Sequence, residues 1–204
     1  MAYQYPLNMR FKLISLTPQV YITEANGNEV VFVRQRMLKL KEDIQIYSDS
    51  SKSEEIFRIK ADRIIDFSAH YHFTDSRLDE PLGSIKRKGM RSLWRATYFV
   101  SDQNEQQTHH IKEDNPWAKV GDALLGEIPF VGFLTSYLFH PIYTAYKGID
   151  REDEQFPVMR MTKQPSLFER FFVIDKLDES LTAAEENRLL LAFMMTVQLE
   201  RGRS

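Results

Sequence analysis

The stretch that decides the fold is LTAAEENRLLLAFMMTVQLERGRS, residues 181–204. Thr182 and Glu185 have the spacing of a capping box, so the sequence predicts a helix over 183–200. Inside this helix, LLLAFMMTVQL (189–199) is apolar almost all the way round. A helix without a polar face must be buried, either in lipid or in protein.

The apolar run is too short to cross a membrane. Residues 189–199 extend for roughly 16 Å as a helix, whereas the hydrocarbon core of a bilayer is about 30 Å thick. We therefore expect the segment to fill the protein's own core. Burial of its large side chains corresponds to roughly 15–30 kcal/mol of gross transfer free energy, so deletion of the segment should unfold the domain.

The composition is that of an ordinary soluble globular protein. The 204 residues are 43% hydrophobic and 27% charged, with a formal net charge of −2. No overall field therefore attracts nucleic acid or an anionic membrane, and any such binding would need a local patch. The absence of cysteine excludes disulfides, thiol catalysis and cysteine-based zinc sites. Since neither a signal peptide nor a membrane-spanning stretch is visible, we expect one cytoplasmic domain over 1–204, without a transmembrane span.

Most of the chain before this helix alternates apolar and polar residues with period two, as half-buried strands do. In FSAHYHF (67–73), for example, Tyr71 and Phe73 fall on one face, and His70 and His72 fall on the other. The predicted strands are 11–16, 20–22, 30–36, 38–47, 56–60, 67–73, 81–88, 93–100, 107–113, 137–146, 156–162 and 170–177.

The connections between these segments fit the same organisation. Asn26-Gly27 suits the type I′ turn of a hairpin, and Asn115-Pro116 is a helix start that predicts a helix over 116–126 between two barrel halves. The C-terminal helix needs walls on every side, and strands are the only walls available. The sequence therefore predicts a mainly β fold with α: a closed antiparallel β-barrel of about twelve strands around a central hydrophobic C-terminal helix.

This arrangement resembles the LURP-one-related family of the tubby-like C-terminal superfamily, which is related to phospholipid scramblases. Three segments carry the resemblance: ITEANGNEVVFVRQRMLKLKEDIQIYSD (22–49), ADRIIDFSAHYHFTDSRLDEPLGSIKRKGMRSLWRATYFVSD (61–102) and NPWAKVGDALLGEIPFVGFLTSYLFHPIY (115–143). The likeness lies in the order of the strands and helices and in the general character of their residues, over nearly the full chain. It implies a tubby-like barrel of twelve strands.

The resemblance also implies functions that concern lipids. Tubby-like proteins suggest binding of phosphoinositides or membrane surfaces, and scramblases suggest lipid traffic. Scramblases carry an acidic calcium segment near the last helix, and the nearest stretch here is DKLDESLTAAEE (175–186). This stretch lacks the loop glycine and the alternate acidic positions of a calcium loop. Calcium-driven scrambling is therefore the weaker alternative.

The densest basic cluster is IKRKGMR (85–91), which is followed by Arg95. One interpretation is a site for an anionic headgroup, because each basic side chain near a membrane surface contributes about 1 kcal/mol. The other interpretation is a solvated hairpin turn, since Lys86 and Arg87 point to opposite faces of a regular strand. The candidate ligand-binding residues are Lys86, Arg87, Lys88, Arg91, Arg95, Arg34 and Arg36.

The histidines do not predict a metal site. His70 and His72 share a strand face, as ligands in an H-x-H pattern do, but further ligands are far away in sequence. His109 and His110 alternate between faces and cannot both chelate one ion. No nucleotide, metalloprotease or nucleophile-elbow motif is present, so we expect no enzyme, no cofactor and no metal.

The leading hypothesis is a non-enzymatic, cytoplasmic tubby-like barrel that binds anionic phospholipid or phosphoinositide headgroups, peripherally, at a membrane surface. The alternative is a structural or regulatory module that binds a protein partner and has no lipid role. Neither hypothesis involves nucleic acid.

Overall fold

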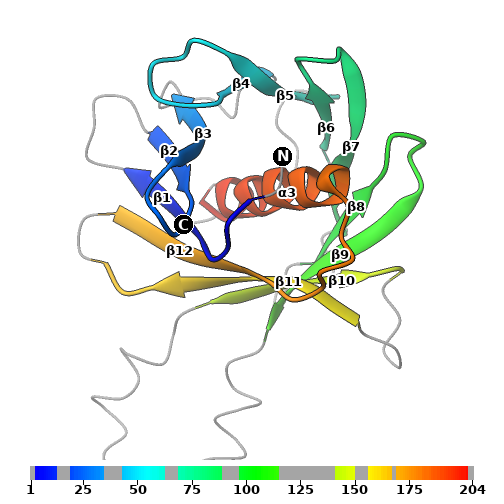
Figure 1. Cartoon of the computed structure of the whole chain (residues 1–204). Helices are drawn as coiled ribbons and strands as arrows, with labels where there is room; N and C mark the ends of the chain where they lie inside the picture. The colour runs from blue at the N-terminus through cyan, green and yellow to red at the C-terminus, as the bar shows by residue number, and fades with distance from the viewer. Residues whose placement is uncertain are drawn as a thin grey trace, which may run out of the picture.

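The computed structural model describes residues 3–12, 19–34, 43–62, 69–88, 97–114, 141–149, 156–166 and 169–201. Twelve strands within these residues close into an antiparallel barrel (Figure 1). The strands are β1 Leu7–Lys12, β2 Gln19–Thr23, β3 Glu29–Arg34, β4 Asp43–Tyr47, β5 Glu55–Ala61, β6 His70–Asp75, β7 Glu80–Arg87, β8 Thr97–Ser101, β9 Gln107–Asp114, β10 Ile142–Lys147, β11 Phe156–Gln164 and β12 Glu169–Lys176.

Strands that follow one another in the chain lie side by side in the barrel, and β1 pairs with β12 to close it. Closure leaves no unpaired sheet edge, which is the usual solution to edge-to-edge association. The period-two pattern decides which side chains face inward. On β6, for example, Tyr71 and Phe73 are buried in the core, whereas His70 and His72 face outward.

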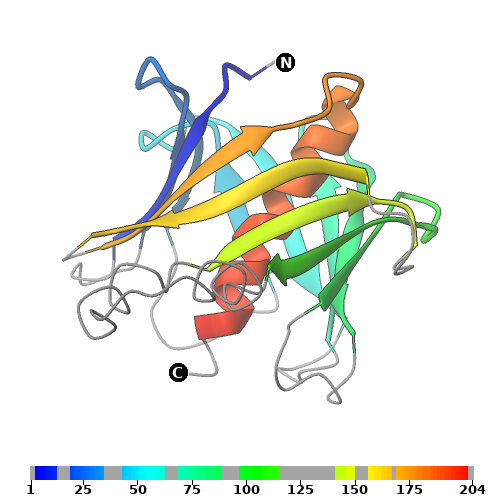
Figure 2. The ribbon, with the colours of Figure 1, turned by 90° about the horizontal axis from the view of Figure 1, so that it is seen from below.

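The helix α3 (Ala183–Arg201) passes through the centre of the barrel and fills it (Figures 1 and 2). Residues 189–195 are all buried, with Leu189, Ala192, Phe193 and Met195 fully inaccessible. The predicted plug of the core is therefore confirmed. The predicted capping box is also present, because Thr182 N donates to Glu185 Oε2 at 2.9 Å and Glu185 N donates to Thr182 Oγ1 at 3.3 Å.

The direction of α3 gives the barrel two distinct ends. At the Ala183 end, hairpin turns join β2 to β3, β4 to β5, β6 to β7 and β8 to β9. At the Arg201 end lie the last residues of the odd-numbered strands and the first residues of the even-numbered ones. The Ala183 end and the Arg201 end therefore carry different sets of connections.

Two details differ from the sequence-based expectations. The first strand begins at Leu7 and not at Phe11, because the alternation of Leu7, Met9 and Phe11 with polar residues continues upstream into the core. The turn between β2 and β3 is not type I′, since Gly27 has a φ of 90° but Asn26 is not among the residues with positive φ. The predicted helix 116–126 lies outside the described residues.

Among the described residues, no helix combines the length and the apolar character that crossing a bilayer requires.

Candidate functional site

The structure places four of the predicted basic residues near the Arg201 end. Lys86 and Arg87 end β7, Lys88 follows them, and Arg34 ends β3. The other three candidates, Arg36, Arg91 and Arg95, lie outside the described residues.

Lys86 and Arg87 point to opposite sides of the barrel wall. Lys86 is exposed on the outer face, where its cross-strand partners are His70 on β6 and Phe99 on β8. Arg87 pairs with Tyr98, whose ring is fully buried inside the barrel. Lys88 returns to the outer face, and its Nζ lies 5.7 Å from the centroid of the Phe99 ring. Of the three residues Lys86, Arg87 and Lys88, the two lysines therefore extend from the outer wall.

Arg34 shares the outer face and the Arg201 end with Lys86, but β3 and β7 are separated by three strands. Adjacent strands lie about 4.8 Å apart, so the two residues are roughly 19 Å apart around the wall. One phosphate group cannot contact both side chains. The structure therefore does not bring Arg34 into the cluster at the end of β7.

The cross-strand register adds a basic residue that the sequence did not single out. Lys60 on β5 lies directly opposite His72 on β6, and His70 on β6 lies directly opposite Lys86 on β7. All four side chains face outward, since their neighbours along each strand point into the core. We call the set Lys60, His70, His72, Lys86 and Lys88 the basic face.

The two imidazoles at the centre of the basic face are stacked at a tilt. The ring centroids of His70 and His72 are 4.5 Å apart, and His70 Nε2 is 2.8 Å from Ser84 Oγ. Burial, and then the charges of His72 and Lys86, lower the pKa of His70 below its ordinary value. These effects favour the neutral form of the His70 imidazole.

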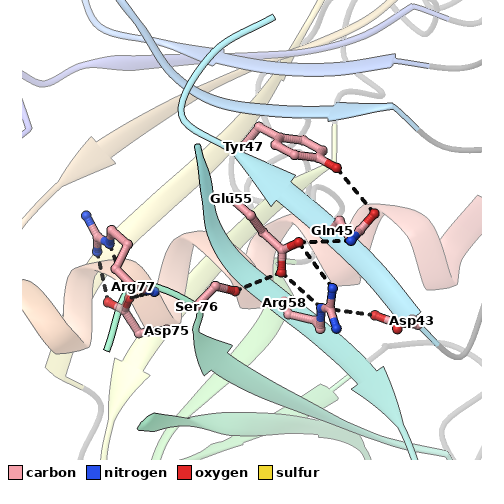
Figure 3. Close-up of polar contacts among 8 residues, drawn as sticks. All are labelled: Asp43, Gln45, Tyr47, Glu55, Arg58, Asp75, Ser76 and Arg77. Carbon is pink, nitrogen blue, oxygen red and sulfur yellow. Dashed lines mark hydrogen bonds and ion pairs between the residues drawn. The ribbon is translucent and has the colours of Figure 1, made fainter. Parts of the chain in front are cut away.

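A network of acidic and basic groups borders the basic face on β4 and β5 (Figure 3). The Glu55 carboxylate accepts bonds from Arg58 Nε at 2.9 Å, Gln45 Nε2 at 2.9 Å and Ser76 Oγ at 2.9 Å. Asp43 Oδ1 adds a contact of 3.5 Å to Arg58 Nε. Because two carboxylates compensate its guanidinium, Arg58 is not a further cation of the basic face.

The bond between Ser84 and His70 does not form a hydrolase site. Ser84 is only 2% exposed, so a substrate cannot reach its hydroxyl. Among the described residues, no carboxylate orients the imidazole of His70 from its Nδ1 atom, as a catalytic triad requires. In the same part of the chain, no group of three or more His, Cys, Asp or Glu residues could hold a metal ion.

The remaining histidines of β9 lie on opposite faces, as the alternation predicts. His109 faces the interior opposite Val100, and His110 faces outward opposite Phe99 and stacks on Tyr146 at 5.4 Å. Both are buried. They are therefore separate from the basic face.

Two carboxylates of the acidic stretch 175–186, Glu185 and Glu186, make internal contacts. Glu185 caps α3 through Thr182, and Glu186 Oε1 accepts a bond of 2.6 Å from Lys176 Nζ. The pKa of Lys176 is raised, mainly because of this hydrogen bond. These carboxylates therefore stabilise the start of the helix and do not form an open cation loop.

Sequence reasoning missed Lys60 because a single sequence does not give the pairing of β5 with β6. The available signal was weak. Arg58 and Lys60 alternate outward, as His70 and His72 do, and a short connection separates the two strands. An antiparallel pairing across that connection brings Lys60 close to the histidines.

Comparison with known proteins supports the family predicted from the sequence. A family model described as "LURP-one-related" matches residues 29–125. A search of curated proteins gave no match. An X-ray structure of a protein from Arabidopsis thaliana is similar, with 12% sequence identity and a TM-score of 0.48, over 99% of this chain and 94% of that chain. Over residues 29–125, the chain is therefore similar to the LURP-one-related family, which is the family that the sequence predicted.

Proposed function

We propose that this barrel binds anionic phospholipid headgroups, phosphoinositides included, at a membrane surface through its basic face. The observation that carries the proposal is the outward placement of Lys60 and Lys86 on either side of the His70–His72 pair. Both lysines are exposed, and Lys88 extends the same face. Three lysines near an anionic surface contribute about 3 kcal/mol, which gives weak, reversible and salt-sensitive binding.

The distribution of charge supports the same orientation. The described turns at the Ala183 end carry Lys52 and Arg77 as their basic residues, among more numerous carboxylates. These carboxylates are Glu24, Asp49, Glu54, Asp79, Asp102, Glu105, Asp178 and Glu179. An anionic membrane repels this end, so the barrel would approach the surface with its Arg201 end and the adjoining basic face.

Sedimentation with vesicles tests the proposal. The protein should bind vesicles of phosphatidylserine and phosphatidylcholine more than vesicles of phosphatidylcholine alone, and salt should weaken the binding. The double variant Lys86→Glu/Lys88→Glu should lose most of this binding. The control Lys52→Glu/Lys147→Glu changes the net charge equally at the Ala183 end and should bind as the unchanged protein does. Equal binding by both variants, or no binding by the unchanged protein, contradicts the proposal.

A second candidate is a protein-interaction module that uses the Ala183 end. The exposed large hydrophobic residues of the described chain, Leu78, Ile149, Phe156 and Leu177, all lie at this end, beside the carboxylates named above. Acidic and apolar groups together suit a basic amphipathic segment of a partner protein. Titration with a peptide of alternating lysine and leucine clusters tests this candidate. Binding that Phe156→Ser weakens and Lys86→Glu leaves unchanged favours this second function.

A further inference from the structure

The basic face has two imidazoles at its centre, between two ammonium groups. His72 lies between Lys60 and Ser84 in cross-strand register, and His70 lies beside Lys86. Side chains directly opposite each other on antiparallel strands have Cβ atoms about 5 Å apart. Four nitrogen-bearing side chains therefore lie together on one outer patch of the wall. They are close enough for one small ligand to lie among them.

Charges of both signs surround this pair, and Asp43 lies opposite Lys60 on β4. Lys60 faces it from β5 and Lys86 from β7, whereas Asp62 and Glu105 are the carboxylates that act on His70 in the opposite sense. Asp62 already accepts the backbone N–H of His70 at 2.9 Å through Oδ1. A proton added to His70 thus meets repulsion from His72 and Lys86 as long as no anion is present.

An anion on the outer patch reverses this balance. Its charge compensates the repulsion between the imidazoles and the lysines, so it stabilises the protonated histidines. Protonated imidazole donates from both nitrogens, and since Ser84 Oγ already contacts His70 Nε2, His70 has Nδ1 left to add a charge-assisted bond to those of the lysines. A phosphate group matches this arrangement, because it is small and has several acceptor oxygens that can serve donors from adjacent strands.

We infer that His70 and His72 form the centre of the anion site, that it takes a phosphate group, and that it binds this group with the histidines protonated. This inference rests on the proposed function, since it assigns that site its ligand chemistry and its regulation. Binding takes up protons and therefore strengthens as the pH falls. Two linked groups of this kind give roughly a tenfold to hundredfold gain in affinity between about pH 7.5 and about pH 5.5.

Vesicles of phosphatidylglycerol in phosphatidylcholine test the lipid source, because the charge of this phosphodiester headgroup does not change over that range. The unchanged protein should bind tenfold or more tightly at the lower pH. His70→Gln/His72→Gln should bind at both pH values as the unchanged protein does at the higher one. The inference is overturned if this variant keeps the pH dependence, or if the unchanged protein shows none.

A second arm uses inorganic phosphate and NMR of the imidazole protons, which detects a phosphate site without a membrane. Phosphate should shift the resonances of His70 and His72 and raise the pKa of His70, and it should leave His109 unaffected. A shift without vesicle binding refutes the membrane function and keeps the phosphate site. If vesicle binding needs Lys86 but does not depend on pH, the membrane function stands and the role of the histidines is refuted. No response in either arm refutes both.

Discussion

Arg188 of α3 lies against Gly83 of β7, inside the barrel. The buried guanidinium donates from Nε to the carbonyl of Leu82 at 2.7 Å, and a Cβ atom at Gly83 would lie 2.7 Å from that Nε. The same Cβ would lie 2.2 Å from the carbonyl oxygen of Ser101. Gly83 also has a φ of 141°, which side chains rarely tolerate. The missing side chain at this position makes room for the arginine.

Gly83→Ala should therefore destabilise the barrel by about 2–4 kcal/mol, because backbone strain and a clash with backbone atoms act together. Urea unfolding followed by circular dichroism measures the change. Gly27→Ala is a matched control, since Gly27 has a φ of 90° but no atom within 4 Å of the added Cβ. The control should cost about 1 kcal/mol. Equal losses in both variants would show that the close approach of Arg188 has no energetic role.

Phe193 of α3 tests the plugged core. Its side chain is fully buried, and Phe193→Ala should lower the free energy of unfolding by about 3–5 kcal/mol through lost burial and a cavity. Phe156→Ala removes the same atoms from a side chain that is 64% exposed and should change stability by less than about 0.5 kcal/mol. Thermal unfolding of the two variants gives the comparison. Similar melting temperatures are incompatible with a helix packed inside the barrel.

His109 predicts a loss of stability in acid. Burial, with the Arg188 and Lys147 charges adding to it and Glu185 opposing it, lowers the pKa of His109 from 6.5 to about 4. The unfolded chain then binds a proton more readily than the folded one, so stability is complete above about pH 6.5 and is lost as the pH falls towards 4. The difference corresponds to roughly 3 kcal/mol.

Urea unfolding at a series of pH values measures this effect in the unchanged protein and in His109→Leu. The substitution should remove most of the acid-dependent loss between about pH 6.5 and about pH 4, because leucine does not titrate. His109 Nε2 has no hydrogen-bond partner in the described part of the chain, so the bond that leucine removes is the 3.0 Å contact between His109 Nδ1 and Thr108 Oγ1. An unchanged pH profile in His109→Leu would assign the acid sensitivity to other groups.

Thr182 should set the start of α3. Thr182→Ala removes the side-chain oxygen that accepts the N–H of Glu185, so the free energy of unfolding should fall by about 1 kcal/mol. Thr182→Ser keeps the hydroxyl and should retain most of that stability. Chemical denaturation of the three proteins provides the test. A serine variant as unstable as the alanine variant would mean that the methyl group matters and the cap does not.

The sequence was sufficient for the fold because each strand and the helix carry their own pattern. Tyr71 and Phe73 face the core as the alternation predicts, and the capping box places the start of α3. Turn geometry was less accessible, since the Asn26-Gly27 pair is compatible with more than one hairpin connection. The local sequence suggests such a turn but does not fix the φ angles of both residues.

The candidate site was only partly predictable, for a different reason. Lys86 and Lys88 stand out as a local run of basic residues, but Lys60 becomes their neighbour only through the pairing of β5, β6 and β7. Arg34 is the opposite case. It was a candidate from the sequence like Lys86, but it lies four strands away from Lys86 in the barrel. The sequence shows where basic residues cluster along the chain. Which residues become neighbours across strands depends on the register, which is a property of the whole barrel.

The order of the elements along the chain has a consequence for biosynthesis. The ribosome completes all twelve strands before it makes α3, and β1 has to wait for β12 before the wall can close. During translation, the inner faces of the strands therefore have no helix to cover them, and such exposed apolar surface favours aggregation. We expect the nascent chain to depend on chaperones until α3 emerges. Final folding should then be slow, because the contacts that complete it join distant parts of the chain.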